Sequence, residues 1–171
     1  MRGKMALLLS TLVIALMVVG TGFALWSKTL YINGTVNTGT VEAGFDNVMC
    51  NDNGIDPGYD KDVASCTVEV SQDHQTITVT INNAYPSYSC DIDYDILNKG
   101  SIPVKIQSIT INAPSEVTVE VTGISVGDQI DPDQLIHGDL HIHVEQTAAQ
   151  GATYTFTVDI LLVQWNEFTP P

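Results

Sequence analysis

The segment CDIDYDI at residues 90–96 carries the pattern that decides the fold. Cys90, Ile92, Tyr94 and Ile96 alternate with three aspartates, so each residue switches from apolar to charged or back. Successive side chains of a β-strand point to opposite faces, so this pattern predicts a strand with one buried face and one face in water.

The same alternation recurs on both sides of this segment. Turn-forming sequences such as Asp56-Pro57-Gly58 separate the alternating runs. A change of apolar parity between Ile106 and Ile109 predicts a β-bulge near Gln107 and Ser108. The other alternating runs are 41–45, 66–70, 77–81, 102–111, 117–121, 140–144 and 154–162. The sequence therefore predicts an all-β fold, a jelly-roll-like two-sheet sandwich of about nine strands.

The first 24 residues have a different composition. Arg2 and Lys4 precede an apolar run over residues 5–19, and small residues follow at 20–24. A positively charged start, a short apolar centre and a cleavage site with small residues are typical of a secretory signal peptide. A membrane-spanning helix needs about 20 apolar residues, so this run is short for that role. We therefore expect a helical signal peptide over residues 1–24 with cleavage after Ala24, and a secreted, extracellular protein that meets the membrane only during export.

The residues that follow form another alternating segment. Trp26, Leu30, Ile32 and Val36 fall on even positions, and polar residues fill most of the odd ones. An apolar strand at the start of a mature chain needs a sheet to join, either its own or that of a neighbouring molecule. We assign residues 25–39 to an N-terminal donor strand segment and residues 40–171 to the β-sandwich domain.

The charge of the chain is strongly acidic. It has 20 acidic and six basic residues, and a formal net charge of −14. Residues 1–24 contain two of the basic residues and none of the acidic ones, so the mature chain would carry −16. Such a charge argues against nucleic acid and anionic membranes as partners, and is compatible with cation binding or simply with solubility.

Three cysteines in an exported chain favour a disulfide, and the odd number leaves one sulfur over. A bond between Cys50 and Cys66 would close a short loop and contribute roughly 3 kcal/mol through the entropy of the unfolded chain. Cys66 with Cys90 is the alternative, because both residues share the inward parity of their strands. The sequence does not choose between the two.

Four aspartates crowd into the turn-rich loop between Cys50 and Cys66. Calcium prefers several oxygen ligands from a flexible loop, so this loop is a candidate calcium site, although a solvated acidic loop explains the same residues. The sequence does not require a cofactor, and calcium is the candidate ion for this loop. The aspartates are Asp52, Asp56, Asp60 and Asp62.

Two histidines are a second candidate metal site. His141 and His143 share one face of a predicted strand and would stand about 7 Å apart, a spacing that can bracket zinc or copper. The alternative is that they simply belong to the solvent-exposed face of an amphipathic strand. Asp91 and its alternate neighbours form a similar acidic face. Asn33, in the sequon Asn33-Gly34-Thr35, is the one candidate glycosylation site.

The sequence gives little support for catalysis. It lacks the HExxH pattern of zinc proteases, and its GxSxG match at Gly123–Gly127 is not followed by the helical pattern that the nucleophile turn of serine hydrolases requires. We therefore expect a protein without enzymatic activity and assign no catalytic residue.

Several short motifs carry a resemblance to a known family. They are Gly22 to Ser27, Ile32 to Gly39, Asn83 to Tyr88, Asn98 to Val104 and Gln164 to Asn166. Together they resemble the TasA/camelysin-like exported proteins with a SipW-type signal peptide, a group that includes subunits of archaeal bundling pili. The resemblance implies a jelly-roll subunit of an extracellular fibre, in which the N-terminal strand of one subunit completes the sheet of the next. Some relatives are described as proteases, and the missing HExxH pattern gives that role no support.

The sequence thus predicts a structural subunit of an extracellular filament, pilus or biofilm-matrix fibre whose partners are copies of itself. Polymerisation would be head to tail, by donor-strand complementation through Trp26, Leu30, Ile32 and Val36. A monomeric secreted β-sandwich that binds calcium or carbohydrate is the alternative, followed by a metal-dependent hydrolase.

Overall fold

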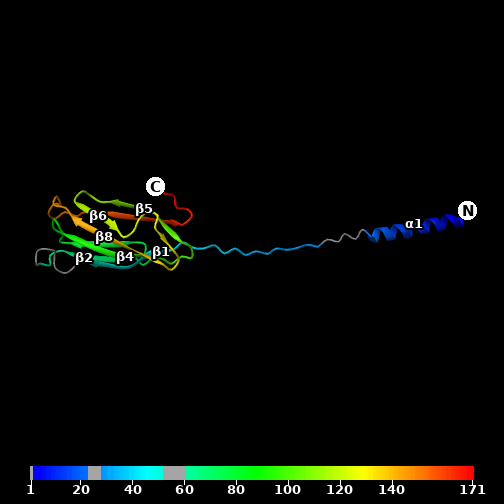
Figure 1. Ribbon diagram of the computed structural model, residues 1–171, viewed down its shortest axis with the longest axis horizontal. Helices are drawn as coiled ribbons and strands as arrows, with labels where there is room; N and C mark the ends of the chain where they lie inside the picture. The colour runs from blue at the N-terminus through cyan, green and yellow to red at the C-terminus, as the bar shows by residue number, and fades with distance from the viewer. Residues whose placement is uncertain (1, 23–27, 52–60) are drawn as a thin grey trace. The chain divides into compact units, whose positions relative to one another are not determined.

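The computed structural model describes residues 2–22, 28–51 and 61–171 (Figure 1). The chain forms two compact units, Met1–Asn37 and Thr38–Pro171, which are described separately below.

The first unit contains the helix α1 (Arg2–Gly22). Leucine, alanine and methionine dominate its sequence and favour helix, and the hydroxyl of Ser10 donates to the carbonyl of Leu7 at 2.9 Å. Within the described ranges, no helix combines the length and apolarity that a membrane crossing requires. The expected cleavage site after Ala24 and the first donor residue, Trp26, lie outside the described residues.

The segment after the helix is not a strand in the single chain. Residues 28–42 form neither helix nor strand, although the alternation predicted a strand up to Val36. Leu30, Ile32 and Val36 are 82%, 98% and 88% exposed, and Asn33 is also exposed. A strand exists only when a neighbour accepts and donates its backbone hydrogen bonds, and apolar alternation alone supplies no neighbour.

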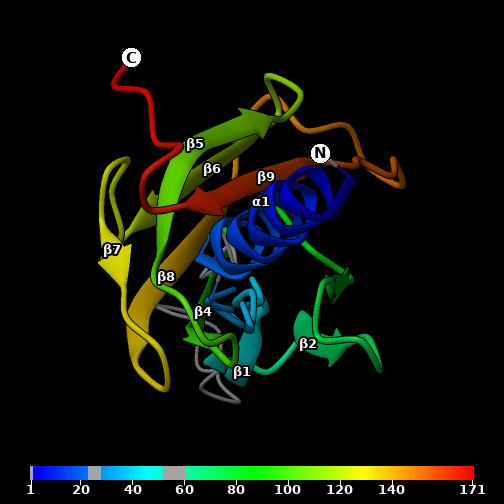
Figure 2. The same ribbon diagram turned by 90° about the vertical axis from the view of Figure 1, so that its right-hand side faces the viewer.

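The second unit is mostly β, as predicted, and consists of antiparallel sheets consistent with an all-β sandwich (Figure 2). Its strands are β1 (Ala43–Asn51), β2 (Ser65–Val70), β3 (Ile77–Asn82), β4 (Ser89–Asn98), β5 (Val104–Asn112), β6 (Val117–Thr122), β7 (Gln129–Ile130), β8 (Leu135–Val144) and β9 (Thr157–Gln164). Hydrogen bonds order them as β1-β4-β8-β6, β2-β3 and β7-β5-β9. The three sheets share one apolar core, with buried residues such as Cys66, Ile92, Ile106, Ile130 and Ile142.

Strand β4 contains the segment that opened the sequence analysis. Its four alternating apolar residues are all buried, as the pattern predicted. Tyr94 lies opposite Gly138 of β8, and a Cβ at Gly138 would stand 2.7 Å from the tyrosine ring. The ring of Tyr94 also meets Phe45 edge to face, with ring centroids 5.7 Å apart. Glycine is therefore required at position 138 for the aromatic ring to lie on the sheet.

Two irregularities interrupt the strand ladders. The register of β5 against β9 shifts between Ile106 and Ser108, which confirms the predicted bulge. A second shift, in β1 between Asp46 and Met49, was not predicted, and Asn47 within it adopts a positive φ of 48°. Such bulges redirect side chains, and this one turns Asn47 toward β4.

A buried turn joins β4 to β5. The Asn98 side chain is 0% exposed, and its amide donates to the carbonyls of Ile102 and Ile130, both at 2.9 Å. The backbone N–H of Gly100 donates to the Asn98 side-chain oxygen at 2.9 Å. A Cβ at Gly100 would meet the carbonyl oxygen of Thr40 at 2.5 Å, so this motif holds the chain before β1 against the turn.

Candidate functional site

Two neighbouring cavities lie along strands β3 and β9. The larger, of about 670 Å³, includes Ile81 at the end of β3 and Tyr154 before β9. The smaller, of about 380 Å³, lies between residues 77–79 of β3 and residues 157–160 of β9. Phe156 lines both cavities, so we treat them as one feature and call it the β3–β9 groove.

The floor of the groove comes from the four-stranded sheet. Ile142, Val144 and Val117 lie under the larger cavity, and Leu140 and Tyr94 under the smaller. The floor residues belong to β8, β6 and β4, which are hydrogen-bonded to neither β3 nor β9 in the ladders of the described residues. The groove therefore overlies the apolar side of one sheet between the edges of two others.

The walls of the groove are edge strands. Among the described strands, β3 is paired only with β2, and β9 only with β5. Their free edges present unpaired backbone N–H and C=O groups, which can hydrogen-bond an added strand. Alternate residues of β3, including Ile77, Val79 and Ile81, remain only partly buried. The sequence predicted these strands and their apolar faces but gave no sign of the opening between them.

Tyr94 marks the floor of the smaller cavity. Its side chain is buried, and within the described part of the chain its hydroxyl has no hydrogen-bond partner. Burial, and secondarily the charge of Asp139, raises the pKa of Tyr94 to about 12. The hydroxyl therefore remains protonated and neutral at all ordinary pH values.

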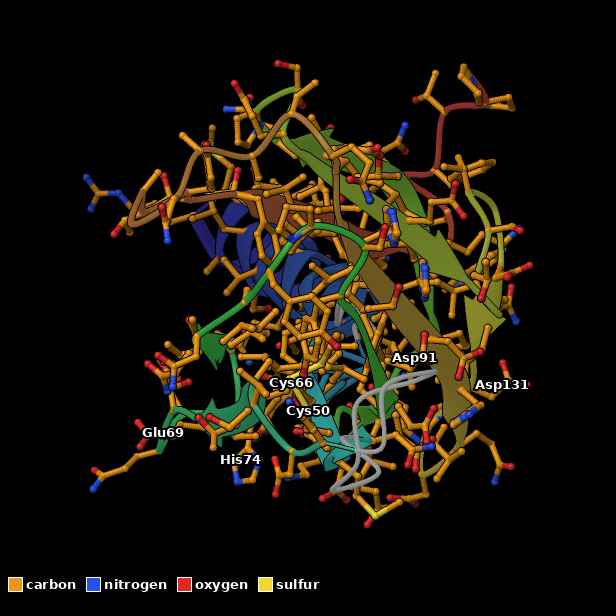
Figure 3. All side chains as sticks on the ribbon, turned by 90° about the vertical axis from the view of Figure 1, so that its left-hand side faces the viewer. Cys50, Cys66, Glu69, His74, Asp91 and Asp131 are labelled. Carbon is orange, nitrogen blue, oxygen red and sulfur yellow. A yellow bond between two sulfur atoms is a disulfide. The ribbon has the colours of Figure 1, made fainter. Side chains whose placement is uncertain are left out.

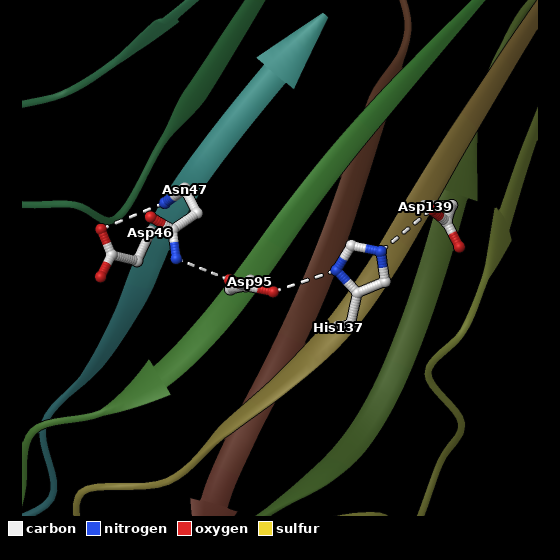
Figure 4. A network of polar contacts seen from close by, with 5 residues as sticks. All are labelled: Asp46, Asn47, Asp95, His137 and Asp139. Atoms are coloured by element: carbon white, nitrogen blue, oxygen red, sulfur yellow. Dashed lines mark hydrogen bonds and ion pairs between the residues drawn. The ribbon is translucent and has the colours of Figure 1, made fainter. Parts of the chain in front are cut away.

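A second feature covers the opposite, polar face of β4 and β8 (Figure 4). Nδ1 of His137 lies 3.0 Å from Oδ1 of Asp95, and the amide of Asn47 donates to Oδ2 of Asp95 at 2.8 Å. The hydrogen bond from Asn47 lowers the pKa of Asp95, with a further contribution from His137. The bond to Asp95 raises the pKa of His137. The bulge in β1 is thus the cause of a three-residue network across β1, β4 and β8.

Asp93 and Asp139 stand directly opposite each other beside this network. Burial, and then the hydrogen bond with Asp139, raises the pKa of Asp93. Ligand atoms of Asp93, His137 and Asp139 all lie within 4.8 Å of one another, so these three residues could hold a divalent cation.

The two histidines that the sequence singled out are placed differently. Nδ1 of His141 lies 2.5 Å from Oδ1 of Asp91, and Nδ1 of His143 lies 2.9 Å from the hydroxyl of Ser89. Neither belongs to a group of three potential ligands within the described residues. Parity placed them on the polar face correctly. Their partners follow from the register of β4 against β8, which the sequence does not encode locally.

The candidate calcium loop is largely outside the described residues. Asp52, Asp56 and Asp60 fall there, and Asp62 is exposed.

The sulfurs of the three cysteines lie within 4.8 Å of one another, and Figure 3 shows two of these residues, Cys50 and Cys66, side by side. Cys66 lies at disulfide distance from both Cys50 and Cys90, with Cα–Cα separations of 6.4 and 6.7 Å. Both separations fall in the range that a disulfide tolerates. The geometry therefore keeps both pairings that the sequence left open.

No family model, curated protein or solved structure matches this chain. The resemblance to TasA/camelysin-like proteins remains a hypothesis from the sequence. The groove, the polar face and the cysteine cluster are the features from which a function can be argued.

Proposed function

We propose that this protein is a secreted structural subunit of an extracellular filament, assembled head to tail by donor-strand complementation. The observation that carries the proposal is a pair of complementary features in one chain. One is the β3–β9 groove, with an apolar floor and two free strand edges. The other is an apolar, alternating and exposed segment around Leu30, Ile32 and Val36.

An inserted strand would complete the architecture. Residues near the end of β3 share the larger cavity with residues before β9, and the start of β3 shares the smaller cavity with the middle of β9. The two edges therefore run in opposite directions along the groove, and an inserted strand would be parallel to one and antiparallel to the other. It would join β2-β3 to β9-β5-β7 in one sheet facing β1-β4-β8-β6, which gives the jelly-roll-like two-sheet sandwich expected from the sequence.

The spacing of the segment suits the groove floor. Leu30, Ile32 and Val36 would point to the floor, and the odd positions, including Asn33, would face outward. Gly34 occupies the same parity as the apolar residues, and without a side chain it can pass over a bulky floor residue such as Tyr94. Parity thus matches the apolar floor with the apolar residues of the segment.

Burial of apolar side chains is the term that favours insertion. Each fully buried Leu, Ile or Val side chain contributes roughly 1.5–3 kcal/mol. Fixing the backbone of each residue costs roughly 1–2 kcal/mol, and backbone hydrogen bonds to both edges offset part of that cost. Trp26 has the largest apolar surface of the predicted donor residues, and its burial would add to the favourable free energy of insertion.

A second copy of the chain is the occupant we propose for the groove. In the single chain, the segment is not a strand and its apolar residues are almost fully exposed. A contact in which one subunit donates a segment to the groove of the next is heterologous, and it produces an open filament when the rotation between subunits does not close. The proposal requires no cofactor and assigns no enzymatic activity.

The test compares two substitutions in the purified mature protein. Ile32→Asp places a charge on the face that would be buried and should abolish filaments in negative-stain micrographs. Thr35→Asp places the same charge on the outward face and should leave filaments intact. A free peptide of residues 25–36 should bind the Ile32→Asp protein and block polymerisation of the unmodified protein. Regular filaments from Ile32→Asp, or from a chain without residues 25–36, would refute the mechanism.

A further inference from the structure

The three cysteines form a cluster that the filament proposal does not use. Cys50 ends β1, Cys66 lies in β2 and Cys90 lies in β4, so three strands bring their sulfurs together. Their Sγ atoms lie within 4.8 Å of one another, and those of Cys50 and Cys90 are 3.3 Å apart. A cysteine sulfur forms one disulfide at a time, so a bond from Cys66 to either neighbour leaves the other as a thiol in contact with that bond.

We propose that Cys66 exchanges its partner, so that one disulfide moves between Cys50–Cys66 and Cys66–Cys90. In the forward step, the Cys90 thiolate attacks Sγ of Cys66 and forms the new bond. The Cys50–Cys66 bond breaks, and its electron pair remains on Sγ of Cys50, which takes up a proton. The reaction is a thiol–disulfide exchange with no net oxidation, so it needs no external oxidant or reductant.

The two isomers differ in which thiol solvent can reach. Cys90 is 1% exposed, so the isomer with a Cys50–Cys66 bond hides its thiol in the core. Cys50 is only partly buried, so the isomer with a Cys66–Cys90 bond leaves the thiol on the more accessible of the two residues. Thiol reactivity depends on access as well as on the thiolate fraction. Cys50 is therefore a modification site that is available in one isomer and protected in the other.

Exchange requires the three sulfurs to change their arrangement. The attacking and leaving sulfurs line up with the central sulfur during exchange, so the Sγ atoms of Cys50 and Cys90, which are 3.3 Å apart, must separate while Cys66 shifts between them. Cys50 and Cys90 lie in neighbouring strands of the four-stranded sheet, whereas β2, which contains Cys66, belongs to a separate two-stranded sheet. Rotation of the Cys50 and Cys90 side chains, together with a displacement of β2, can therefore bring the sulfurs into line while the ladder between β1 and β4 stays intact.

The exchange also connects to the groove, and this part rests on the proposed function. Cys66 is paired across the ladder with Ile81, which lines the larger cavity. One isomer ties β2 to β1 and the other ties it to β4. The position of one groove wall thus depends on which bond is present.

Peptide mapping of the monomeric Ile32→Asp protein tests the exchange separately from polymerisation. The sample is acidified to stop exchange, unfolded in denaturant at that pH so that buried thiols become accessible, alkylated with N-ethylmaleimide and digested without reductant. We expect both linked peptides, Cys50–Cys66 and Cys66–Cys90, with alkylation at Cys50 and Cys90 and none at Cys66. Alkylation under mildly alkaline native conditions should then convert both isomers into one product, in which Cys50 is alkylated and Cys66 is bonded to Cys90.

Two variants calibrate the measurement. Cys50→Ser should contain only the Cys66–Cys90 bond, and Cys90→Ser only the Cys50–Cys66 bond, which shows that each bond forms alone. One linkage in the unmodified protein that does not change during alkaline alkylation would overturn the proposal. Three free thiols, or a bond between Cys50 and Cys90, would also overturn it.

Discussion

Asn98 shows how one buried polar side chain fixes a junction of the chain. Its amide and carbonyl satisfy backbone groups of Ile102, Ile130 and Gly100, in a site without solvent access. Its position in a motif of turn residues was visible in the sequence. Its burial was not visible, because the residues that enclose it come from distant parts of the chain.

Substituting Asn98 by alanine should destabilise the protein strongly. The change removes the donor to the carbonyls of Ile102 and Ile130, and each buried group without a partner costs roughly 1–3 kcal/mol, whereas the Gly100 N–H keeps the carbonyl of Glu42 at 2.9 Å. We expect the free energy of unfolding in denaturant titrations to fall by about 3 kcal/mol or more. Asn82→Ala, at an exposed position of β3, is the matched control and should change it by about 0.5 kcal/mol or less. Similar losses for both variants would show that Asn98 does not have this role.

The pair of Asp95 and His137 predicts a pH-dependent stability. The raised pKa of His137 adds stability that is fully present below the ordinary histidine value of 6.5 and is lost as the pH rises through the folded value. The lowered pKa of Asp95 adds stability above the ordinary value of 3.8, and this is lost as the pH falls through the folded value. Both contributions to stability are present between pH 3.8 and pH 6.5.

His137→Gln should therefore lose most stability within that window and less at alkaline pH. Denaturant titrations across the pH range measure the difference between the unmodified protein and the variant. In an Asp95→Asn background, the same substitution should show a much weaker pH dependence. A difference that stays constant across the pH range would contradict the pairing.

At the scale of elements, the walls of the groove provide a test that leaves the donor segment unchanged. Val79 lines the smaller cavity from β3, whereas Thr80 is exposed and has the opposite parity. Val79→Glu should block insertion and abolish filaments, because an inserted strand would bury the new carboxylate without a partner. Thr80→Glu should polymerise normally. Circular dichroism and thermal melting verify that both variants fold, and filaments from folded Val79→Glu would argue against this groove as the acceptor.

The strands also show which features of the fold can be predicted from the sequence. Alternation at residues 90–96 gave the buried face of β4, and the parity change at Gln107 gave the bulge, because both are local properties of a strand. Pairing is not local: the contact of His137 with Asp95 depends on how β4 lies against β8. The short strand β7 was missed because two residues contain no periodicity. Lys28 to Val36 has the periodicity of a strand but no partner within the described single chain.

For the whole molecule, the net charge of −16 expected after removal of residues 1–24 opposes close packing of identical subunits. Monovalent salt screens this repulsion over about 10 Å at 0.1 M, whereas bound calcium neutralises carboxylates directly. We expect filaments to become shorter and to melt at lower temperature after chelation, and to recover with calcium but not with sodium at equal ionic strength. The variant Asp93→Asn tests whether the pair of Asp93 and Asp139 contributes to the recovery with calcium. Full recovery with sodium would identify plain screening instead.

The groove and the apolar segment would also give the proposed filament two chemically different ends. In that filament every interior subunit would have its groove filled and its segment inserted, but one terminal subunit would keep an empty groove and the other a bare segment. Growth is therefore polar, and each end has its own capping agent. A chain with Val79→Glu can still donate its segment and would terminate the end that offers a groove. A chain with Ile32→Asp can still accept and would terminate the opposite end, so traces of either variant should limit the length of filaments made by the unmodified protein.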